Sequence, residues 1–423
     1  MKIRLFLCFL FALGATFLRA AGQNRTLVPD VRTLRVECGR DGLAFPALRL
    51  GSDECARISF DADSHDYRRF VYKAEHCDMN WQTSEELFDA EYLRAADDYI
   101  VVENYEESIN TTWLYTHYSF EFPSADMQPL LSGNYKITIY EDADDDLRPV
   151  AEAYLYIYEP LTGVTLTVST DTDTDRHVSH QQLTLDVNYS GLTLFDAREE
   201  LKVAVLQNRR TDNARFKPAP TSDTGAALLW EHARSLIFEA GNEYRKFEIL
   251  STRYPGRHVD GIRWYDPLFH ATLQPDFRRR NYLYDEDNDG VFVPRAEKGG
   301  DADTEADYLL VHFTLDAAGL DEDSLYVAGA WSGYDFSPAY RMDYDAVADA
   351  YTAALLLKQG YYEYLYLTAP KSSSDSRTAA VEGDFYQTEN EYTVLVYRRS
   401  PGVRGERLVG WRTARYLSKL GAG

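Results

Sequence analysis

The chain has 423 residues, 45% hydrophobic and 26% charged, with a formal net charge of −24. This length predicts two to four domains, and 32 Tyr and 20 Phe against only 15 Pro predict an all-β chain rather than a disordered one. The acidic excess disfavours nucleic acid and anionic lipid headgroups as partners. It favours basic partners or, more simply, a well solvated surface.

Residues 1–22 have the pattern of a secretory signal peptide. Lys2 and Arg4 precede an apolar run, LFLCFLFALGATFL, and a small-residue site predicts cleavage before about Gln23. No later segment of the sequence is long and apolar enough to cross a bilayer. No cysteine directly follows the small-residue site, so we expect no direct lipid anchor. The mature protein is therefore expected to be soluble in an exported compartment.

Three cysteines remain in the mature chain, Cys38, Cys55 and Cys77. This odd number leaves open one disulfide with one free thiol, and three buried apolar cysteines fit the sequence equally well. The sequence contains no CxxC pair. The cysteines therefore predict neither a metal site nor a redox function.

Residues 23–160 are predicted to form an N-terminal β-sandwich. Strand-like runs alternate with polar turns, among them ARISFDA, THYSFEFP and GNYKITIYED. This unit holds 28 acidic against 12 basic residues. A long connection inside it carries a helix-capping signal at Thr83 or Ser84 and predicts a short helix. Such connections often bind partners, but the aromatic residues around this one are equally expected to form core beneath it.

Residues 161–300 are predicted to form a second β domain. Its start is marked by the turn-like sequence EPLTG, which a strand-like run, VTLTVST, follows. The charges are nearly balanced, with 18 basic against 21 acidic residues. The basic groups Arg209–Arg210 and Arg278–Arg280 are expected to form salt bridges with acidic neighbours, and contact with a carboxylate-rich partner or a sugar is the alternative.

A candidate metal site lies in the run YDEDNDGVF of this second unit. Asp285, Asp287 and Asp289 match the opening of a calcium loop, in which alternate carboxylates point at one hard cation. The twelfth position of the loop is Ala296 instead of Glu. We therefore favour a hairpin turn with Asp289 and Gly290 at positive φ, and expect no metal or other cofactor.

Residues 301–423 are predicted to form a C-terminal immunoglobulin-like β-sandwich, which makes three such domains in a row. Its strand-like runs include SLYVAGAW, YTAALLL, YYEYLYL and EYTVLVY. Gly360 is expected to form a tight hairpin turn. Tyr392–Tyr397 is expected to be a central strand because both of its faces are largely apolar. We expect disorder from Ser418 onward.

The strong sequence motifs for catalysis are missing. The chain has no nucleophile elbow, no phosphate-binding glycine loop and no HExxH helix. His177 and His180 are three residues apart without a third ligand nearby, which favours a surface pair over a metal site. We therefore expect no enzymatic activity, while a carboxylate pair that only folding brings together would escape this test.

The C-terminal unit resembles the early-set and glycogen-binding immunoglobulin-like modules. The resemblance rests on SLYVAGAWSGYD, with its turn at Gly329–Trp331, and on the runs that follow. In such modules exposed aromatic rings stack on sugars, which makes Trp331, Tyr334 and Phe336 the candidates for sugar or partner contacts. Core packing is the stronger expectation for Trp331 and Phe336. A carbohydrate-binding protein of the periplasm or cell surface is thus the alternative function.

A second resemblance covers nearly the whole mature chain. It rests on NTTWLYTHYSFEFP, SGNYKITIYED, QNRRTDNA, FEAGNEYRKFEI, LKQGYYEYLYL and EGDFYQTENEYTVLVYRR, in this order. These phrases resemble the plug protein family of the type IX secretion system of Bacteroidetes. The resemblance implies a soluble periplasmic protein at the inner side of the outer membrane, which binds the translocon barrel and closes it when no cargo is in transit. It implies no binding motif at the level of single residues.

Overall fold

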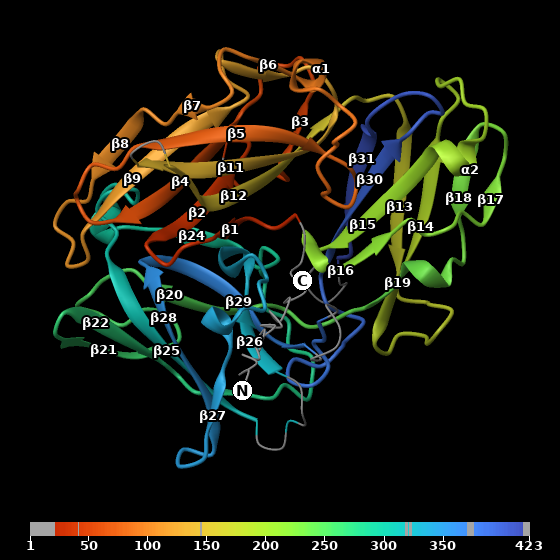
Figure 1. Cartoon of the computed structure of the whole chain (residues 1–423). Helices are drawn as coiled ribbons and strands as arrows, with labels where there is room; N and C mark the ends of the chain where they lie inside the picture. Colours follow the sequence, from red (N-terminus) through yellow and green to blue (C-terminus); the bar gives the residue numbers. More distant parts are fainter. Residues whose placement is uncertain are drawn as a thin grey trace, which may run out of the picture.

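The computed structural model describes residues 22–40, 42–143, 146–317, 320, 324–369 and 376–417. The predicted signal peptide, apart from Gly22, and the tail from Ser418 lie outside the described residues. The expected all-β fold is confirmed, since strands make up nearly all of the regular structure and the two α-helices have four residues each. All but two of the strands form three sandwich-like pairs of sheets (Figure 1), and the remaining two, β6 (Leu93–Ala95) and β10 (Met127–Pro129), pair with each other.

The first sandwich contains every element from β1 to β12. One sheet has the strand order β1-β12-β11-β5-β7, with β3 beside β12, and the other has the order β2-β4-β9-β8. Its elements are β1 (Arg25–Thr26), β2 (Val31–Glu37), β3 (Ala47–Arg49), β4 (Ala56–Asp63), β5 (Phe70–Cys77), α1 (Asp89–Tyr92), β6 (Leu93–Ala95), β7 (Ile100–Val101), β8 (Asn104–Glu107), β9 (Tyr115–Phe122), β10 (Met127–Pro129), β11 (Gly133–Ala143) and β12 (Asp146–Tyr158).

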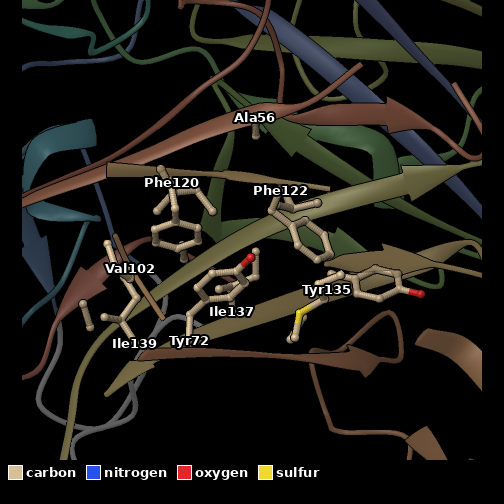
Figure 2. Packing of buried hydrophobic residues seen from close by; sticks show 14 of the residues in the cluster. Ala56, Tyr72, Val102, Phe120, Phe122, Tyr135, Ile137 and Ile139 are labelled. Carbon is tan, nitrogen blue, oxygen red and sulfur yellow. The ribbon is translucent and has the colours of Figure 1, made fainter. Parts of the chain in front are cut away.

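The core of the first sandwich follows from the alternation of side chains along its strands. Tyr135, Ile137 and Ile139 of β11 all point to one face and are fully buried. From the neighbouring strand Tyr72 stacks on Phe120 of the opposite sheet, with ring centroids 4.1 Å apart. Figure 2 shows these side chains filling the space between the two sheets.

The short helix of the long connection begins later than the capping signal predicts. Ser84 is held to β5, because its hydroxyl lies 2.8 Å from His76 Nδ1 and its N–H donates to the His76 carbonyl. The helix α1 instead starts after Phe88, whose N–H donates to the Glu91 side chain at 2.8 Å. The attachment to β5 therefore overrides the local capping signal.

The second sandwich is built from two distant parts of the sequence. One sheet has the order β13-β14-β18-β17 with β19 beside β14, and the other has the order β16-β15-β30-β31. Its elements are β13 (Gly163–Ser169), β14 (His180–Asn188), α2 (Ala197–Glu200), β15 (Leu201–Gln207), β16 (Arg210–Phe216), β17 (Ser222–Asp223), β18 (Ala227–Trp230), η1 (Arg234–Leu236), β19 (Ile237–Glu239), β30 (Glu391–Arg398) and β31 (Arg407–Arg415).

The third sandwich is inserted between these two parts. One sheet has the order β20-β29-β24 with β26 beside β29, and the other has the order β21-β22-β25-β28-β27 with β23 beside β25. Its elements are β20 (Arg245–Ile249), β21 (Val259–Tyr265), β22 (Leu268–Leu273), β23 (Asp276–Phe277), β24 (Phe292–Pro294), η2 (Glu297–Gly299), β25 (Tyr308–Asp316), β26 (Ser324–Ala328), η3 (Ala330–Ser332), η4 (Pro338–Tyr340), β27 (Asp343–Asp345), β28 (Ala350–Lys358) and β29 (Gly360–Ala369).

The sheets do not follow the expected division into residues 161–300 and 301–423. Strands β22 and β25 lie on opposite sides of that boundary and pair in one sheet. At the C-terminus β30 leaves the third sandwich and pairs with β15 along its length, as the blue and green strands of Figure 1 show. Tyr392–Tyr397 is thus a central strand, as expected, but of the second sandwich. Strand periodicity reveals an apolar strand without revealing its partner.

Gly360 does not form the expected hairpin turn. Strands β28 and β29 on either side of it belong to opposite sheets of the third sandwich, and Gly360 has no positive φ. It is the first residue of β29 and lies between Ile249 of β20 and Pro294 of β24. A Cβ there would come within 2.5 Å of the Val293 carbonyl oxygen. The glycine is required by this close approach of two backbones.

Candidate functional site

The three aspartates of the candidate calcium turn serve separate partners. Asp285 forms ion pairs with Lys246 at 2.8 Å and Arg257 at 3.0 Å, and Asp289 forms one with Arg415 at 2.6 Å. Asp287 accepts backbone N–H groups, including that of Asp289. In the part of the chain that the structure describes, no three His, Cys, Asp or Glu side chains are placed to hold a metal ion. The carboxylates thus act as anchors between elements.

The backbone of this turn has the expected conformation without forming a hairpin. Asp289 and Gly290 have φ values of 60° and 96°. The flanking strands β23 and β24 pair with β25 and β29, which lie in different sheets. Gly290 also has a packing role, because a Cβ there would lie 2.4 Å from the Tyr334 hydroxyl. The turn therefore carries the chain from one sheet to the other.

Trp331, Tyr334 and Phe336 do not form an open aromatic platform. Tyr334 is 2% exposed, and its hydroxyl lies 2.9 Å from that of Tyr244. The guanidinium of Arg210 lies 5.2 Å from the centre of its ring. Trp331 is half-buried and donates its indole N–H to the Glu363 carbonyl at 3.0 Å, and Phe336 packs edge-on against Tyr326 with ring centroids 5.2 Å apart. Tyr334 offers no open ring face, so sugar stacking does not fit this residue.

Two of these sequence motifs nevertheless converge at one place. A cavity of about 200 Å³ lies where the three sandwiches meet, and both aromatic and charged side chains line it. Its lining includes Phe45, Tyr154, Arg209, Asp289, Phe292, Trp331 and Tyr334. Asp289 and Trp331 come from separate motifs, and only the packing of the sandwiches brings them to the same junction. The junction of the three sandwiches is therefore the candidate functional site.

The first and second sandwiches share a continuous apolar core, which we call the apolar interface. Trp81 packs edge-on against Tyr154 with ring centroids 4.9 Å apart. The hydroxyl of Tyr397 from β30 donates to Asn134 Oδ1 at 2.8 Å. The buried apolar residues of this interface are Phe45, Cys77, Met79, Trp81, Tyr154, Tyr156, Ala204, Leu206, Leu395, Tyr397 and Leu408. An apolar interface of this extent holds two domains in one orientation.

The first and third sandwiches meet through buried charges, which we call the ionic interface. Lys358 at the end of β28 places its Nζ 2.7 Å from Asp61 Oδ2 of β4, and their side chains are 1% and 0% exposed. Tyr308 donates its hydroxyl to the same Asp61 oxygen at 2.6 Å. Burial by itself would raise the pKa of Asp61, but Lys358 and His117 together hold that pKa below its ordinary value.

A second carboxylate, Asp303, extends the ionic interface. It forms ion pairs with Arg57, at 2.8 Å, and with Arg35 of the first sandwich. Its burial opposes ionisation, but His117, Arg35 and Arg57 outweigh this effect and lower its pKa to about 2. Nearby Asp307 accepts the backbone N–H groups of residues 112 and 113. The third sandwich thus presents carboxylates to cations and N–H groups of the first.

The expected ion pairs with acidic residues are present for Arg209, Arg210 and Arg279 of the two basic groups, whereas Arg278 donates to the Ala317 carbonyl at 3.1 Å. Arg209 pairs with Glu391 at 3.1 Å and Arg210 with Asp212 at 2.7 Å. Arg279 pairs with Glu382 at 3.5 Å. Together with Arg415 and Asp289, these pairs lie at or near the crossings between the second and third sandwiches. The ion pairs fix internal geometry and leave these arginines engaged within the molecule.

The sequence predictions did not include the buried pair of Asp61 and Lys358. Alternation along β4 places Asp61 on the same face as Arg57 and Ser59, which is the polar face of that strand. Lys358 ends the apolar run YTAALLLK, where a lysine is ordinary at a strand end. A buried charge requires a partner, because burying it alone is very costly. The partner lies 297 residues away, so no local pattern in the sequence indicates this pair.

Cys38 and Cys77 are buried, Cys55 is half-buried, and all three are free. Burial raises the pKa of Cys38 and of Cys77 to about 12, so both are thiols at neutral pH. Over the described ranges, every helix is too short to span a membrane.

Comparisons with known proteins match this architecture. Residues 31–159, which run from β2 to the end of the first sandwich, match the family model of the type 9 secretion system plug protein first domain. A crystal structure of a hypothetical protein from Parabacteroides merdae is 36% identical with a TM-score of 0.90, and the alignment covers 93% of this chain and 99% of that chain.

More distant structures add nothing to this result. The C-terminal domain of the AgI/II polypeptide BspA from Streptococcus agalactiae is 7% identical, with 90% of this chain and 99% of that chain covered. Its TM-score of 0.13 carries no argument. No protein of curated function matches the chain.

Proposed function

The chain belongs to the plug protein family of the type 9 secretion system, and on this premise we propose that it closes the periplasmic end of the secretion barrel when no cargo is in transit. The observation that carries the proposal is the joining of three sandwiches into one body by the apolar and ionic interfaces. A barrel wide enough for folded cargo leaks small solutes unless a body larger than the opening blocks it.

Rigidity is the property that a plug needs most. Domains joined only by linkers move relative to one another unless their interface is large and apolar. Here the chain crosses twice between the second and third sandwiches, and the first sandwich is held by both of the others. A body of this kind covers an opening without deforming. We therefore place the closing function in the whole three-sandwich block.

Because closure must be reversible, the surface that contacts the barrel is expected to be polar. A plug must leave when cargo arrives, which favours a polar and charge-complementary contact over an obligate apolar one. The net charge of −24 suits a contact of that kind with a basic partner. In this proposal the predicted signal peptide delivers the protein to the periplasm, at the inner side of the outer membrane.

Affinity capture from the native host tests the partner. The protein carrying a C-terminal tag is purified from detergent-solubilised envelopes, and we expect it to recover the outer-membrane secretion barrel. A tagged periplasmic protein of similar size and charge serves as the control. Failure to recover the barrel from cells in which the barrel is abundant would contradict the proposal.

Deletion of the gene tests closure. Cells without the plug are expected to become permeable to large antibiotics that the intact outer membrane excludes, because idle barrels stay open. Complementation with the intact gene should restore exclusion. A second deletion that also removes the barrel should abolish the leak. An unchanged permeability in the single deletion would argue against closure as the function.

A further inference from the structure

One edge of the first sandwich is open on both of its sheets. Strand β7 ends the order of one sheet and β8 ends the order of the other. All four residues of β8 are exposed. Figure 1 shows β7 and β8 on the outer side of the first sandwich, away from the second sandwich. This edge is therefore accessible to another protein.

The backbone of β8 offers hydrogen-bonding groups to an added strand. The N–H of Ser108, just after β8, donates to the Tyr115 carbonyl at 2.8 Å and so faces β9. Backbone groups alternate in direction along a strand, so those of Asn104 and Glu106 also face β9. Those of Tyr105 and Glu107 face outward. An edge with such outward groups is a template for strand addition.

The charge of this edge is strongly negative and is not compensated from within. Glu107 has one ion-pair partner, His65, at 3.8 Å. Across the described chain, none of the other exposed carboxylates of the edge forms an ion pair; they are Asp66, Asp97, Asp98, Glu103 and Glu106. Other carboxylates of this sandwich form ion pairs, as in the pairs Arg68–Glu141 and Lys136–Glu75.

Two exposed tyrosines lie beside these carboxylates. Tyr67 is 63% exposed and Tyr105 of β8 is 48% exposed, and their ring centroids are 5.3 Å apart. Exposed aromatic rings next to hydrogen-bonding groups are the usual anchors of protein contacts. Tyrosine rings also cover the aliphatic stems of Arg and Lys and attract their charged ends.

We propose that this edge is the docking surface for the secretion partner, and that the partner contributes a basic, extended segment that adds as a strand beside β8. The proposal rests on the proposed plug function, because it names the surface through which the plug holds its partner. Backbone groups of Tyr105 and Glu107 pair with the added strand. Its Lys and Arg side chains meet the carboxylates, and the tyrosines pack against their stems.

Another open edge, β21, lacks this charge signature. It ends in Trp264 and Tyr265, which are 47% and 53% exposed. Its exposed charges include both Arg263 and Asp266, so they do not select a partner of one sign. The acidic edge is preferred because charge complementarity identifies the chemistry of its occupant.

Binding measurements with the purified barrel test the docking surface. The probe is the detergent-solubilised barrel, and the full mature protein is immobilised for biolayer interferometry at low and high salt. The variant Glu103→Lys/Glu106→Lys/Glu107→Lys is expected to bind about tenfold or more weakly and with a smaller salt dependence. The matched control is Asp53→Lys/Glu231→Lys/Asp260→Lys, which reverses three exposed carboxylates without ion pairs elsewhere. It is expected to bind within about threefold of the parent.

A backbone variant tests strand addition separately from charge. Glu107→Pro removes an outward N–H while sparing the bonds to β9, and proline is tolerated at such edge positions. We expect weaker binding with an unchanged thermal midpoint. If this variant binds as well as the parent, strand addition is wrong. If the lysine variant binds like its control while the parent binds the barrel, the docking surface is wrong and the plug function stands. If the parent never binds the barrel, the plug function itself fails.

Discussion

The two interfaces of the first sandwich achieve the same attachment by different physical means. The apolar interface joins it to the second sandwich through a shared core that includes Trp81 and Leu395. The ionic interface joins it to the third through Asp61 and Lys358, with little exposure of either. Burial of apolar surface stabilises the folded state with little preference for one orientation. A buried ion pair adds little net stability, but removing one of its members destabilises the fold strongly.

The two interfaces have separate roles in making the three sandwiches one rigid body. The apolar interface supplies most of the adhesion, and its strength depends little on pH or salt. The ionic interface selects one orientation, because any other leaves charges buried without partners. It also makes the attachment sensitive to pH. Variants of each interface and changes of pH therefore separate the two roles.

Removal of one member of the buried pair should have the largest effect. Lys358→Met leaves the carboxylate of Asp61 buried without its cation, and we expect the free energy of unfolding to fall by about 3–5 kcal/mol. Urea unfolding followed by tryptophan fluorescence measures the change. The double variant Lys358→Met/Asp61→Asn should recover part of the loss, since no uncompensated charge remains. A double variant less stable than the single one would contradict this account.

Truncating a side chain of the apolar interface should lower the free energy of unfolding slightly less than removing Lys358 does. Leu395 is 1% exposed, and Leu395→Ala should lower the free energy of unfolding by about 2–4 kcal/mol through lost burial and a new cavity. The loss should be the same at low and high salt. Val178, which is 59% exposed, provides a matched control as Val178→Ala, with a change below about 0.5 kcal/mol. A strong salt dependence of the Leu395 variant would show that the two interfaces are not distinct.

Acid should weaken the ionic interface before the apolar one. The pKa of Asp303 is about 2 in the folded protein, below the ordinary value of about 4. The unfolded chain therefore binds more protons in this range, and stability is lost as pH falls from about 4 to 2. We expect about 2 kcal/mol from this group. Asp303→Asn should show a smaller loss between pH 5 and pH 3 in thermal unfolding, and an unchanged pH profile would refute the assignment.

Glu243 lies where the chain passes from the second to the third sandwich. Its effect on stability should have the opposite pH dependence, with stability lost as pH rises. Burial raises the pKa of Glu243 to about 8, and Asp287 adds to this effect. The folded protein therefore holds a proton that the unfolded chain releases above about pH 4.5, so stability falls as pH rises from there toward 8. Glu243→Gln should be more stable than the parent by about 1 kcal/mol at pH 8 and no more stable at pH 5. Equal effects at both pH values would argue against this interpretation.

Several elements were predictable because they depend on neighbours in the chain. Alternating apolar residues indicated the strands, and an Asp-Gly pair indicated the positive φ of Asp289 and Gly290. The ion pair of Arg210 with Asp212 was expected because the two residues lie close together in sequence. In each of these cases the physical cause lies within a few residues, where sequence spacing and spatial distance agree.

Gly360 shows how the same reasoning fails at longer range. A glycine between two apolar runs is typical of a hairpin, but here the runs lie in opposite sheets and the glycine admits the backbone of β24. The displaced domain boundary has the same origin. The pairing of β30 with β15 brings Leu201 beside Arg398. Pairing over such a distance in sequence follows from loop closure in the folded chain, and no local pattern indicates it.

The class of fold, the strands and the family of the chain can be inferred from the sequence, because strand propensity and turn chemistry act between neighbouring residues. The pairing of the strands, the contact between Asp61 and Lys358 and the exposure of the β8 edge are known only from the folded structure. Packing and charge pairing act between surfaces that only folding brings together.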